Sequence, residues 1–189
     1  SVDVRNAGFK LAPVDTNLFP GGFNNLNPAF LPLCVQAVQA AVEHVCPDAR
    51  GVLLVPENHT RNTFYLRNVA TLEGILKQAG LSVRIGTLIP DITAPTKIDL
   101  PDGSSLTLEP IVRTGNRVGL AGFDPCMVLL NNDLSAGPPA ILQGIEQPIA
   151  PPLAAGWYNR LKSHHFEAYH AVADEFGARL QAGKVAAGA

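Results

Sequence analysis

Apolar positions recur along the chain with two different periods, and the period assigns each segment to a strand or to a helix. Residues 9–14, 51–55 and 126–130 are short runs of mainly apolar side chains, which predict strands. Residues 81–88 alternate between apolar and polar side chains and predict a further strand. Because such strands alternate with helical segments, the pattern predicts an α/β fold with a mostly parallel sheet.

Between these strands, apolar residues repeat every three or four positions, as on one face of a helix. The pattern predicts helices over residues 28–46 and 63–79, a short helix over 138–145, and a last helix over 163–180. The tail, 181–189, is small and polar, and we expect it to fray. Strands over 97–100 and 105–112 are expected to form a β-hairpin insertion across a Pro-Asp-Gly-Ser turn.

Composition narrows the class of protein. The chain has 189 residues, of which 47% are hydrophobic, so it can bury the core of one domain. The net charge of −2 argues against a nucleic-acid partner, and no apolar run approaches the ~20 residues that a membrane span needs. The three cysteines are odd in number and not clustered, which indicates free thiols and a cytoplasmic location.

Polar loops follow three of the predicted strands, at residues 15–25, 57–62 and 131–133. Ligands of parallel sheets bind beyond the carboxyl ends of the strands, so we expect these loops to share one edge of the sheet. The candidate substrate-binding residues that they supply are Asp15, Asn17, Asn24, Asn25, Asn58, Thr60, Arg61, Asn62, Asn131, Asn132 and Asp133.

The second of these loops gives the most specific prediction. It leads directly into a helix, whose free backbone N–H groups and dipole favour an anion. Arg61 adds a bidentate partner, so we predict that it contacts a substrate carboxylate. The alternative is ordinary helix capping by Asn58 or Thr60, with Arg61 in solvent. Turn formation is likewise an alternative role for Asn24 and Asn25.

Other chemistries lack their signatures in this sequence. Gly21-Gly22 permits close backbone approach, but neither a dinucleotide-binding glycine motif nor a phosphate-binding loop occurs. His164, His165, His170 and Asp174 lack the spacing of a metalloprotease helix and are interpreted as a solvated helix face, so no metal site is predicted. No serine nucleophile elbow is present, and no catalytic residue is assigned.

The polar loops lie within longer motifs. These are VDTNLFPGGFNNL at 14–26, PENHTRN at 56–62 with Tyr65-Leu66, VRIG at 83–86, NNDLS at 131–135, and the segment from Gly156-Trp157 to KSHHF at 162–166. In this order they resemble the proteobacterial glutamate–cysteine ligases of the ATP-grasp type. The resemblance covers nearly the whole chain, to about residue 180.

The resemblance implies a reaction. Such ligases join the γ-carboxylate of glutamate to the amine of cysteine, the first step of glutathione biosynthesis. ATP and Mg²⁺ activate the carboxylate as an acyl phosphate, which the cysteine amine attacks. In this family a Rossmann-like, three-layer front domain precedes the ATP-grasp domain, and this chain resembles the front domain alone. The resemblance therefore implies a substrate domain at 1–162, and a C-terminal helix with a frayed tail at 163–189 as a linker to an ATP-grasp domain. ATP and Mg²⁺ are not expected to be bound by this chain by itself.

Two further hypotheses stay open at this point. The chain is either the substrate-side part of a ligase, or a non-catalytic module that binds an amino acid, or a structural domain that forms a homo-oligomer. The last predicted helix is amphipathic and fits packing either on this domain or on a neighbour. Calorimetric titration with glutamate, cysteine and ATP separates the second hypothesis from the third.

Overall fold

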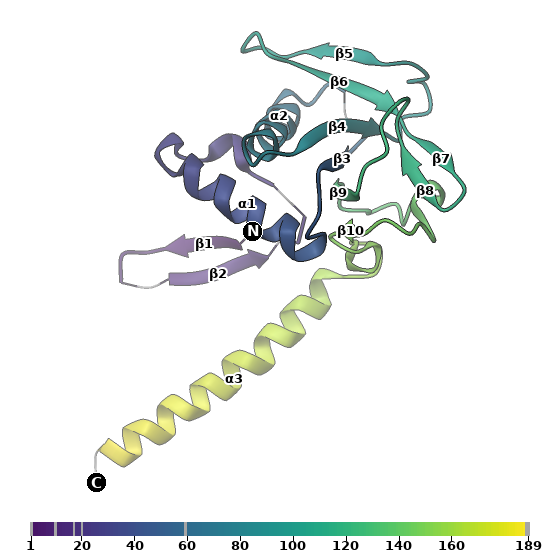
Figure 1. Ribbon diagram of the computed structural model, residues 1–189. Coiled ribbons are helices and arrows are strands. Elements are labelled where there is room, and N and C mark those ends of the chain that lie inside the picture. The colour runs from purple at the N-terminus through teal and green to yellow at the C-terminus, as the bar shows by residue number, and fades with distance from the viewer. Residues whose placement is uncertain (1, 10, 17, 20, 59, 188–189) are drawn as a thin grey trace.

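A six-stranded sheet forms the centre of the computed structural model, which describes residues 2–9, 11–16, 18–19, 21–58 and 60–187 (Figure 1). The strand order is β10-β9-β3-β4-β6-β5, and every neighbouring pair is parallel except β5 with β6. The strands are β3 (Gly51–Pro56), β4 (Ser82–Thr87), β5 (Thr96–Asp99), β6 (Ser105–Pro110), β9 (Met127–Asn131) and β10 (Ile149–Ala150). The predicted α/β class with a mostly parallel sheet is confirmed.

The strand order reverses in the middle of the sheet. The chain enters the sheet at β3, builds outward through β4 to β6 and β5, and then returns to add β9 on the other side of β3. Pro56 pairs with Asn131, so β3 and β9 end level with each other. In open α/β sheets, a reversal of this kind leaves a crevice at the carboxyl ends of the two strands. The fold therefore places a potential binding site beyond Pro56 and Asn131.

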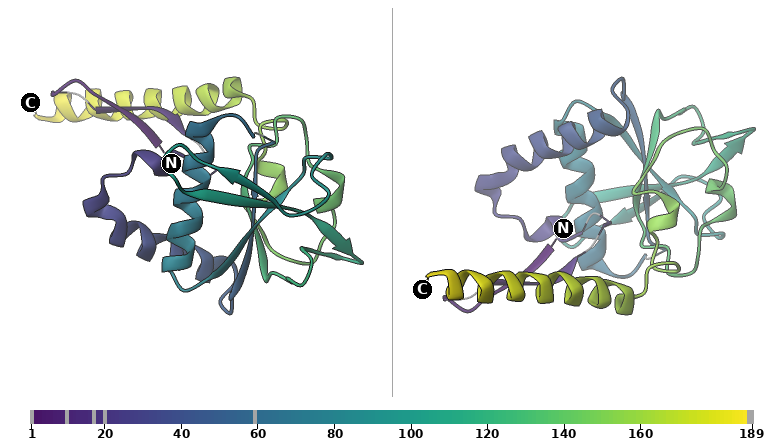
Figure 2. Two further views of the ribbon diagram at one scale, coloured as in Figure 1. Left: turned by 90° about the horizontal axis from the view of Figure 1, so that it is seen from above. Right: turned by 90° about the horizontal axis from the view of Figure 1, so that it is seen from below.

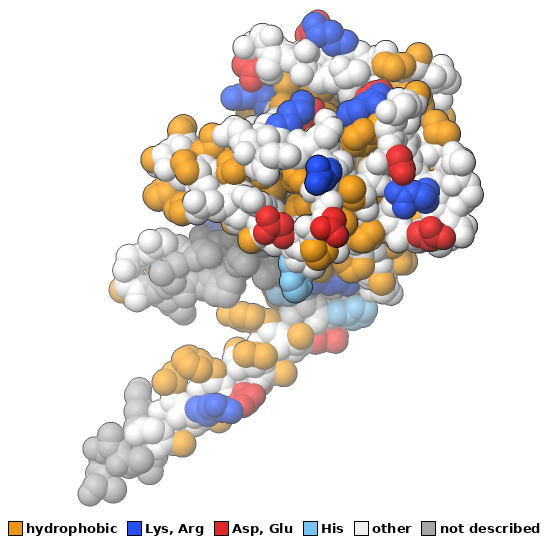
Figure 3. All heavy atoms as spheres, viewed as in Figure 1, with side chains coloured by type: hydrophobic (Ala, Val, Ile, Leu, Met, Phe, Trp, Pro, Cys, Tyr) orange, Lys and Arg blue, Asp and Glu red, His pale blue; other side chains and the backbone are white. Residues whose placement is uncertain are grey.

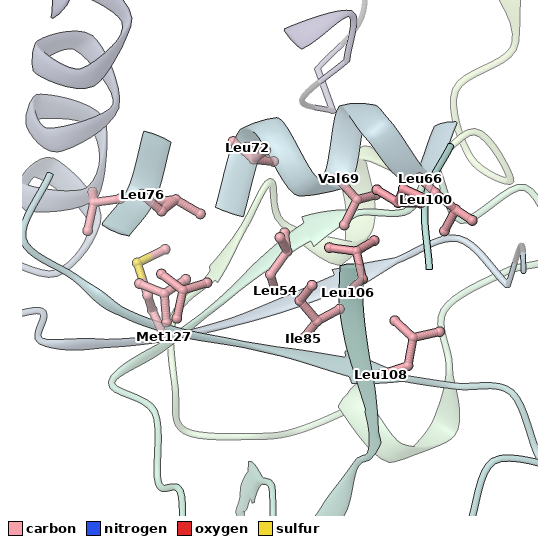
Figure 4. Packing of buried hydrophobic residues seen from close by; sticks show 13 residues of the cluster. Leu54, Leu66, Val69, Leu72, Leu76, Ile85, Leu100, Leu106, Leu108 and Met127 are labelled. Carbon is pink, nitrogen blue, oxygen red and sulfur yellow. The ribbon is translucent and has the colours of Figure 1, made fainter. Parts of the chain in front are cut away.

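β3 is buried on both faces and divides the core in two. Val52 and Leu54 pack in a cluster with α2 (Thr63–Gln78), whereas Leu53 and Val55 pack on the opposite side. Figure 4 shows the first cluster, to which α2 contributes Leu66, Val69, Leu72 and Leu76. α1 (Leu31–Val45) lies on the same side of the sheet as α2 (Figure 2). This continuous burial is typical of a central parallel strand.

The second face of the sheet is covered by a hairpin and short turns. β7 (Val112–Thr114) pairs with β8 (Arg117–Gly119), and Val118 of this hairpin belongs to the second cluster together with Leu53 and Val55. The helix predicted over 138–145 is a 3-10 turn, η3 (Ala140–Leu142). The prolines before this turn and the glycine at 144 limit it to three residues.

Several other elements follow the prediction closely. α2 begins where expected, because the Asn62 side chain accepts a hydrogen bond from Tyr65 N at 3.1 Å and caps the helix. Gly80 follows α2 with a φ of 85°, a left-handed conformation that glycine adopts without strain. The predicted hairpin is β5–β6, with Ile98 opposite Leu106. α1 is preceded by a 3-10 turn, η2 (Pro28–Phe30).

The first predicted strand lies outside the main sheet, so its expected place as a strand of that sheet is wrong. β2 (Leu11–Thr16) pairs with β1 (Val2–Asn6), and the two form a separate antiparallel sheet. Pro13 has no backbone N–H to donate, so this segment suits a two-stranded ribbon better than a central strand. Phe9, between the two strands, is 92% exposed.

α3 (Lys162–Ala187) projects from the body of the molecule (Figure 1). It includes 181–187, where fraying was expected, and alanines in this segment favour the helix. One side of α3 carries exposed apolar residues, which we call the apolar face of α3: Phe166, Tyr169, Val172, Phe176 and Leu180. Within the described part of the chain, no helix is long and apolar enough to cross a membrane.

A buried leucine and an exposed leucine are predicted to contribute differently to the free energy of unfolding. Leu54 is fully buried between β3 and α2, so Leu54→Ala is expected to lower the free energy of unfolding by about 2–5 kcal/mol. Leu180 is 53% exposed, and Leu180→Ala is expected to change it by about 0.5 kcal/mol or less. Urea denaturation of this chain measures both values. Equal losses for the two variants would contradict the assignment of the core.

Candidate functional site

A cavity of about 870 Å³ opens at the carboxyl ends of β3 and β9. Three segments far apart in the sequence, around residues 19–25, 57–68 and 131–139, supply most of its walls, and Leu88 also lines it. Its polar lining residues are Asn24, Asn25, Glu57, Asn58, Tyr65, Asn68, Asn131, Asn132, Asp133 and Ser135. The cavity thus lies at the strand-order reversal, where the fold favours a ligand site.

The predicted site residues fall into two groups. The residues that line the cavity are Asn24, Asn25, Asn58, Asn131, Asn132 and Asp133. Thr60 and Arg61 are exposed and are not among its described lining residues, while Asn62 caps α2. Asp15 belongs to β2, but its side chain lies outside the described part of the structure, as does the whole of Asn17. The contact of Arg61 with a substrate stays a prediction.

Asn68 explains why the first loop reaches the cavity although β2 is not in the main sheet. This residue of α2 is 5% exposed. Its Oδ1 accepts a hydrogen bond from Phe23 N at 2.9 Å, and its Nδ2 donates to Asn131 Oδ1 at 3.3 Å. The side chain therefore joins the 3-10 turn η1 (Phe23–Asn25) to the end of β9. A buried amide is stable in this position because both its ends are paired.

Tyr65 connects the ends of the two central strands. Its hydroxyl donates to the Asn131 carbonyl at 2.8 Å and accepts from Glu57 N at 2.7 Å. Burial raises the pKa of Tyr65 above its ordinary value. The hydrogen bond from Glu57 N opposes this in part, and the nearby Glu57 and Asp133 carboxylates raise the pKa further. The phenol is consequently neutral over the physiological range and keeps both hydrogen bonds.

Glu57 and Asn132 fix the turn that follows β9. Glu57 Oε1 accepts from Asp133 N at 2.6 Å, and Asn132 Nδ2 donates to the Pro56 carbonyl at 3.3 Å. Asn132 Oδ1 also accepts from Leu134 N at 2.9 Å. Leu134 has a φ of 58°, which is unusual for a residue with a branched side chain and costs roughly 1–3 kcal/mol. The hydrogen bonds around the turn offset this cost.

Residues 156–157, in the segment before α3, contact this turn. Trp157 N donates to the Asp133 carbonyl at 2.8 Å. At Gly156, a Cβ atom would lie 2.7 Å from Leu134 Cβ, closer than carbon atoms approach without displacement. A glycine is therefore required at 156 for the two segments to touch. This contact gives the predicted GW motif a structural role next to the NNDLS motif.

The charged side chains among the described lining residues are both acidic, Glu57 and Asp133. A charge of the same sign about 4 Å from either would cost roughly 1–4 kcal/mol, depending on how much water remains, and an opposite charge would gain as much. The cavity thus suits an ammonium group, with amide side chains available for hydrogen bonds. Among the described residues, no three His, Cys, Asp or Glu side chains are grouped closely enough to hold a metal ion.

Sequence reasoning missed several lining residues that carry the site. Tyr65 lies within the helix predicted over 63–79 and is not among the candidate site residues, and neither are Glu57, Asn68 and Ser135. Asn68 had a usable signal, because it lies three residues after Tyr65 and four before Leu72, on the buried face of α2. A lone amide on an apolar helix face indicates a buried hydrogen-bond partner.

Two of three comparisons with known proteins find a similar family or structure. The family model described as glutamate-cysteine ligase matches residues 1–186. A search of curated proteins found no match. The crystal structure of a candidate gamma-glutamylcysteine synthetase from Methylobacillus flagellatus KT is similar, with a TM-score of 0.85 and 67% identity, and the match covers 94% of this chain. The match covers 42% of that protein, so this chain spans less than half of its length.

Removing the Tyr65 hydroxyl tests the connection between the strands. Tyr65→Phe leaves Glu57 N–H and the Asn131 carbonyl without this partner, so the free energy of unfolding is expected to fall by about 1–3 kcal/mol. Tyr169→Phe on the exposed α3 is the matched control, with an expected change of about 0.5 kcal/mol or less. Urea denaturation measures both variants.

The difference in stability between the wild type and Tyr65→Phe is predicted to depend on pH. Because the pKa of Tyr65 is raised above 10.0 in the folded state, the protonated phenol stabilises the fold fully below pH 10.0. Above that pH the unfolded chain loses the proton first, so the stabilisation declines. The stability gap between the wild type and Tyr65→Phe is therefore expected to narrow as the pH rises above 10.0. A gap that widened there would contradict the burial of the phenol.

Proposed function

The chain belongs to the glutamate–cysteine ligase family, and from this premise we propose that it forms the amino-acid-binding part of an ATP-dependent ligase. The reaction is formation of γ-glutamylcysteine, the first step of glutathione biosynthesis, in the cytoplasm. The observation that carries the proposal is the polar cavity between β3 and β9, since three of the motifs that mark the family resemblance supply its walls. Glutamate and cysteine are the proposed substrates.

We assign ATP and Mg²⁺ to a part of the ligase outside this chain. The chain matches 42% of its structural relative, which leaves room for a separate ATP-grasp domain. The described residues do not fit a metal site, because they provide no group of three metal-ligating side chains. The proposed division is a substrate domain at 1–162, in the N-terminal part of the ligase, with α3 as the connection to the ATP-grasp domain.

In this proposal the chain contributes by holding and orienting the substrates. Asn24 and Asn58 approach the cavity from two different loops, and both amides can donate to and accept from an amino acid. Correct orientation of two reactants can supply several kcal/mol of the barrier reduction. Arg61, exposed at the start of α2, is the proposed contact for a substrate carboxylate.

Substitution of the cavity amides tests the proposed function. Asn24→Ala and Asn58→Ala in the intact ligase are each expected to lower kcat/KM by up to about tenfold, because each removes a hydrogen bond worth about 0.5–1.5 kcal/mol. Gln39→Ala, an amide exposed on α1, is the matched control and should retain activity. Product formation is measured by chromatography. Full activity of both cavity variants, with the fold intact, would refute the assignment.

We propose that the remainder of the ligase covers the apolar face of α3. Its five large apolar residues are between 44% and 66% exposed, and Figure 3 shows apolar side chains along the helix. The acidic residues Glu167, Asp174 and Glu175 are also on α3, at helical positions away from these five residues. More than half of the structural relative lies outside the region matched by this chain, and that segment is the proposed occupant.

A charge placed on this face tests the packing. Phe176→Glu is expected to lower the melting temperature and the activity of the intact ligase, because a carboxylate would be buried without a partner. In this chain alone, the same substitution is expected to change the free energy of unfolding by about 0.5 kcal/mol or less, since Phe176 is exposed. Glu167→Gln, outside the apolar face, is the control.

The oligomeric state of the chain gives the result that would contradict the proposed packing on α3. If ultracentrifugation shows a dimer that Phe176→Glu dissociates, while the intact ligase is unaffected by this substitution, the face joins two copies instead. The chain would then fit the alternative of a homo-oligomerisation domain.

A further inference from the structure

We propose that the cavity between β3 and β9 is the subsite for cysteine and not for glutamate, an assignment that rests on the proposed function. The two substrates differ in charge. At neutral pH cysteine carries one carboxylate and one ammonium group, whereas glutamate carries a second carboxylate. A site whose charged lining is acidic discriminates between them in favour of cysteine.

The acidic lining is formed by side chains with fixed positions. Glu57 Oε1 is held by Asp133 N at 2.6 Å, and Asp133 Oδ1 accepts from Ser135 N at 2.9 Å. Both carboxylates also lie near the Tyr65 hydroxyl, which is anchored to both strands. The two negative charges are thus held in place before a ligand arrives, and an ammonium group binds them at little ordering cost.

Beside the amide side chains, part of the remaining wall is apolar. Phe19 and Leu134 are buried residues of the lining, at 3% and 2% exposure, and Phe64 contributes an aromatic ring at 73% exposure. A thiol on a short apolar stem can lie against such a surface, whereas the second carboxylate of glutamate would lose hydration there. The described lining residues offer that carboxylate no lysine, arginine or histidine as a partner.

The roles of the two substrates in the reaction agree with a cysteine site in this cavity. The glutamate γ-carboxylate must lie next to the phosphate donor, which we assign to the part of the ligase outside this chain. The amine that attacks the activated carboxylate comes from the other substrate. An ammonium group has no lone pair, so cysteine must lose a proton before its amine can attack, and the Glu57 and Asp133 carboxylates that line the cavity are available to accept that proton.

Titration of the ¹⁵N-labelled chain, followed by NMR, tests the assignment. Cysteine, kept reduced, and its thiol-free analogue 2-aminobutyrate are expected to shift the amide signals of Asn131 and Asp133. N-acetylcysteine lacks the ammonium group, and glutamate adds a carboxylate, so both are expected to bind at least about tenfold more weakly, or ~1.4 kcal/mol.

Substitutions test whether cysteine binding depends on the negative charge of Asp133 or only on the shape of its side chain. Asp133→Asn keeps an oxygen that can accept from Ser135 but removes the charge, so it is expected to weaken cysteine binding by about tenfold, ~1.4 kcal/mol. Asp99→Asn, an exposed carboxylate on β5, is the matched control and should bind cysteine like the wild type. Equal binding of cysteine by wild type and Asp133→Asn would overturn the charge argument.

The outcomes distinguish this inference from the proposed function. If glutamate shifts the Asn131 and Asp133 signals at concentrations equal to or lower than those needed for cysteine, the cysteine assignment is wrong, but the cavity remains an amino-acid site. If N-acetylcysteine binds as tightly as cysteine, the ammonium group is not what the cavity recognises. If neither substrate shifts these signals, both the cysteine assignment and the proposed amino-acid site fail.

Discussion

The arrangement of the site depends on the buried side chain of Asn68. Its two ends join η1 to the end of β9, and α2 holds the amide in the core between them. Because β2 pairs outside the main sheet, strand pairing does not bring the first loop to the cavity. Leaving either end of the amide unpaired would expose a buried polar group to an apolar core, which is costly, so the network favours a single arrangement of the three segments.

Periodicity predicted the elements whose environment is set by the core. β3 and α2 were identified because every residue of β3 is buried and α2 presents a regular apolar stripe to it. The same reasoning misplaced residues 9–14, since an apolar run does not reveal its pairing partner and Pro13 was not weighed as an obstacle to a central strand. It also ended α3 too early, because a small, weakly patterned tail can still be helical when alanine is frequent.

The position of the site was easier to predict than its chemistry. Asn58 and residues 131–133, expected together at the strand ends, line one cavity because β3 and β9 are adjacent and end level, and their contact with a substrate stays a prediction. Asn24 and Asn25 reach the cavity for a different reason, the bridge through Asn68. The expected positive charge, Arg61, lies outside the described lining, while the acidic side chains of Glu57 and Asp133 define it. Local sequence shows where charges occur but not which of them converge in space.

The tight contact between Gly156 and Leu134 links two parts of the molecule mechanically. Residues 156–160 lead into α3, and Trp157 is hydrogen-bonded to the carbonyl of Asp133. With so little space between Gly156 and Leu134, a reorientation at the base of α3 would be transmitted to the turn that carries Asp133. A change in the orientation of α3 would therefore alter the position of Asp133 at the wall of the cavity.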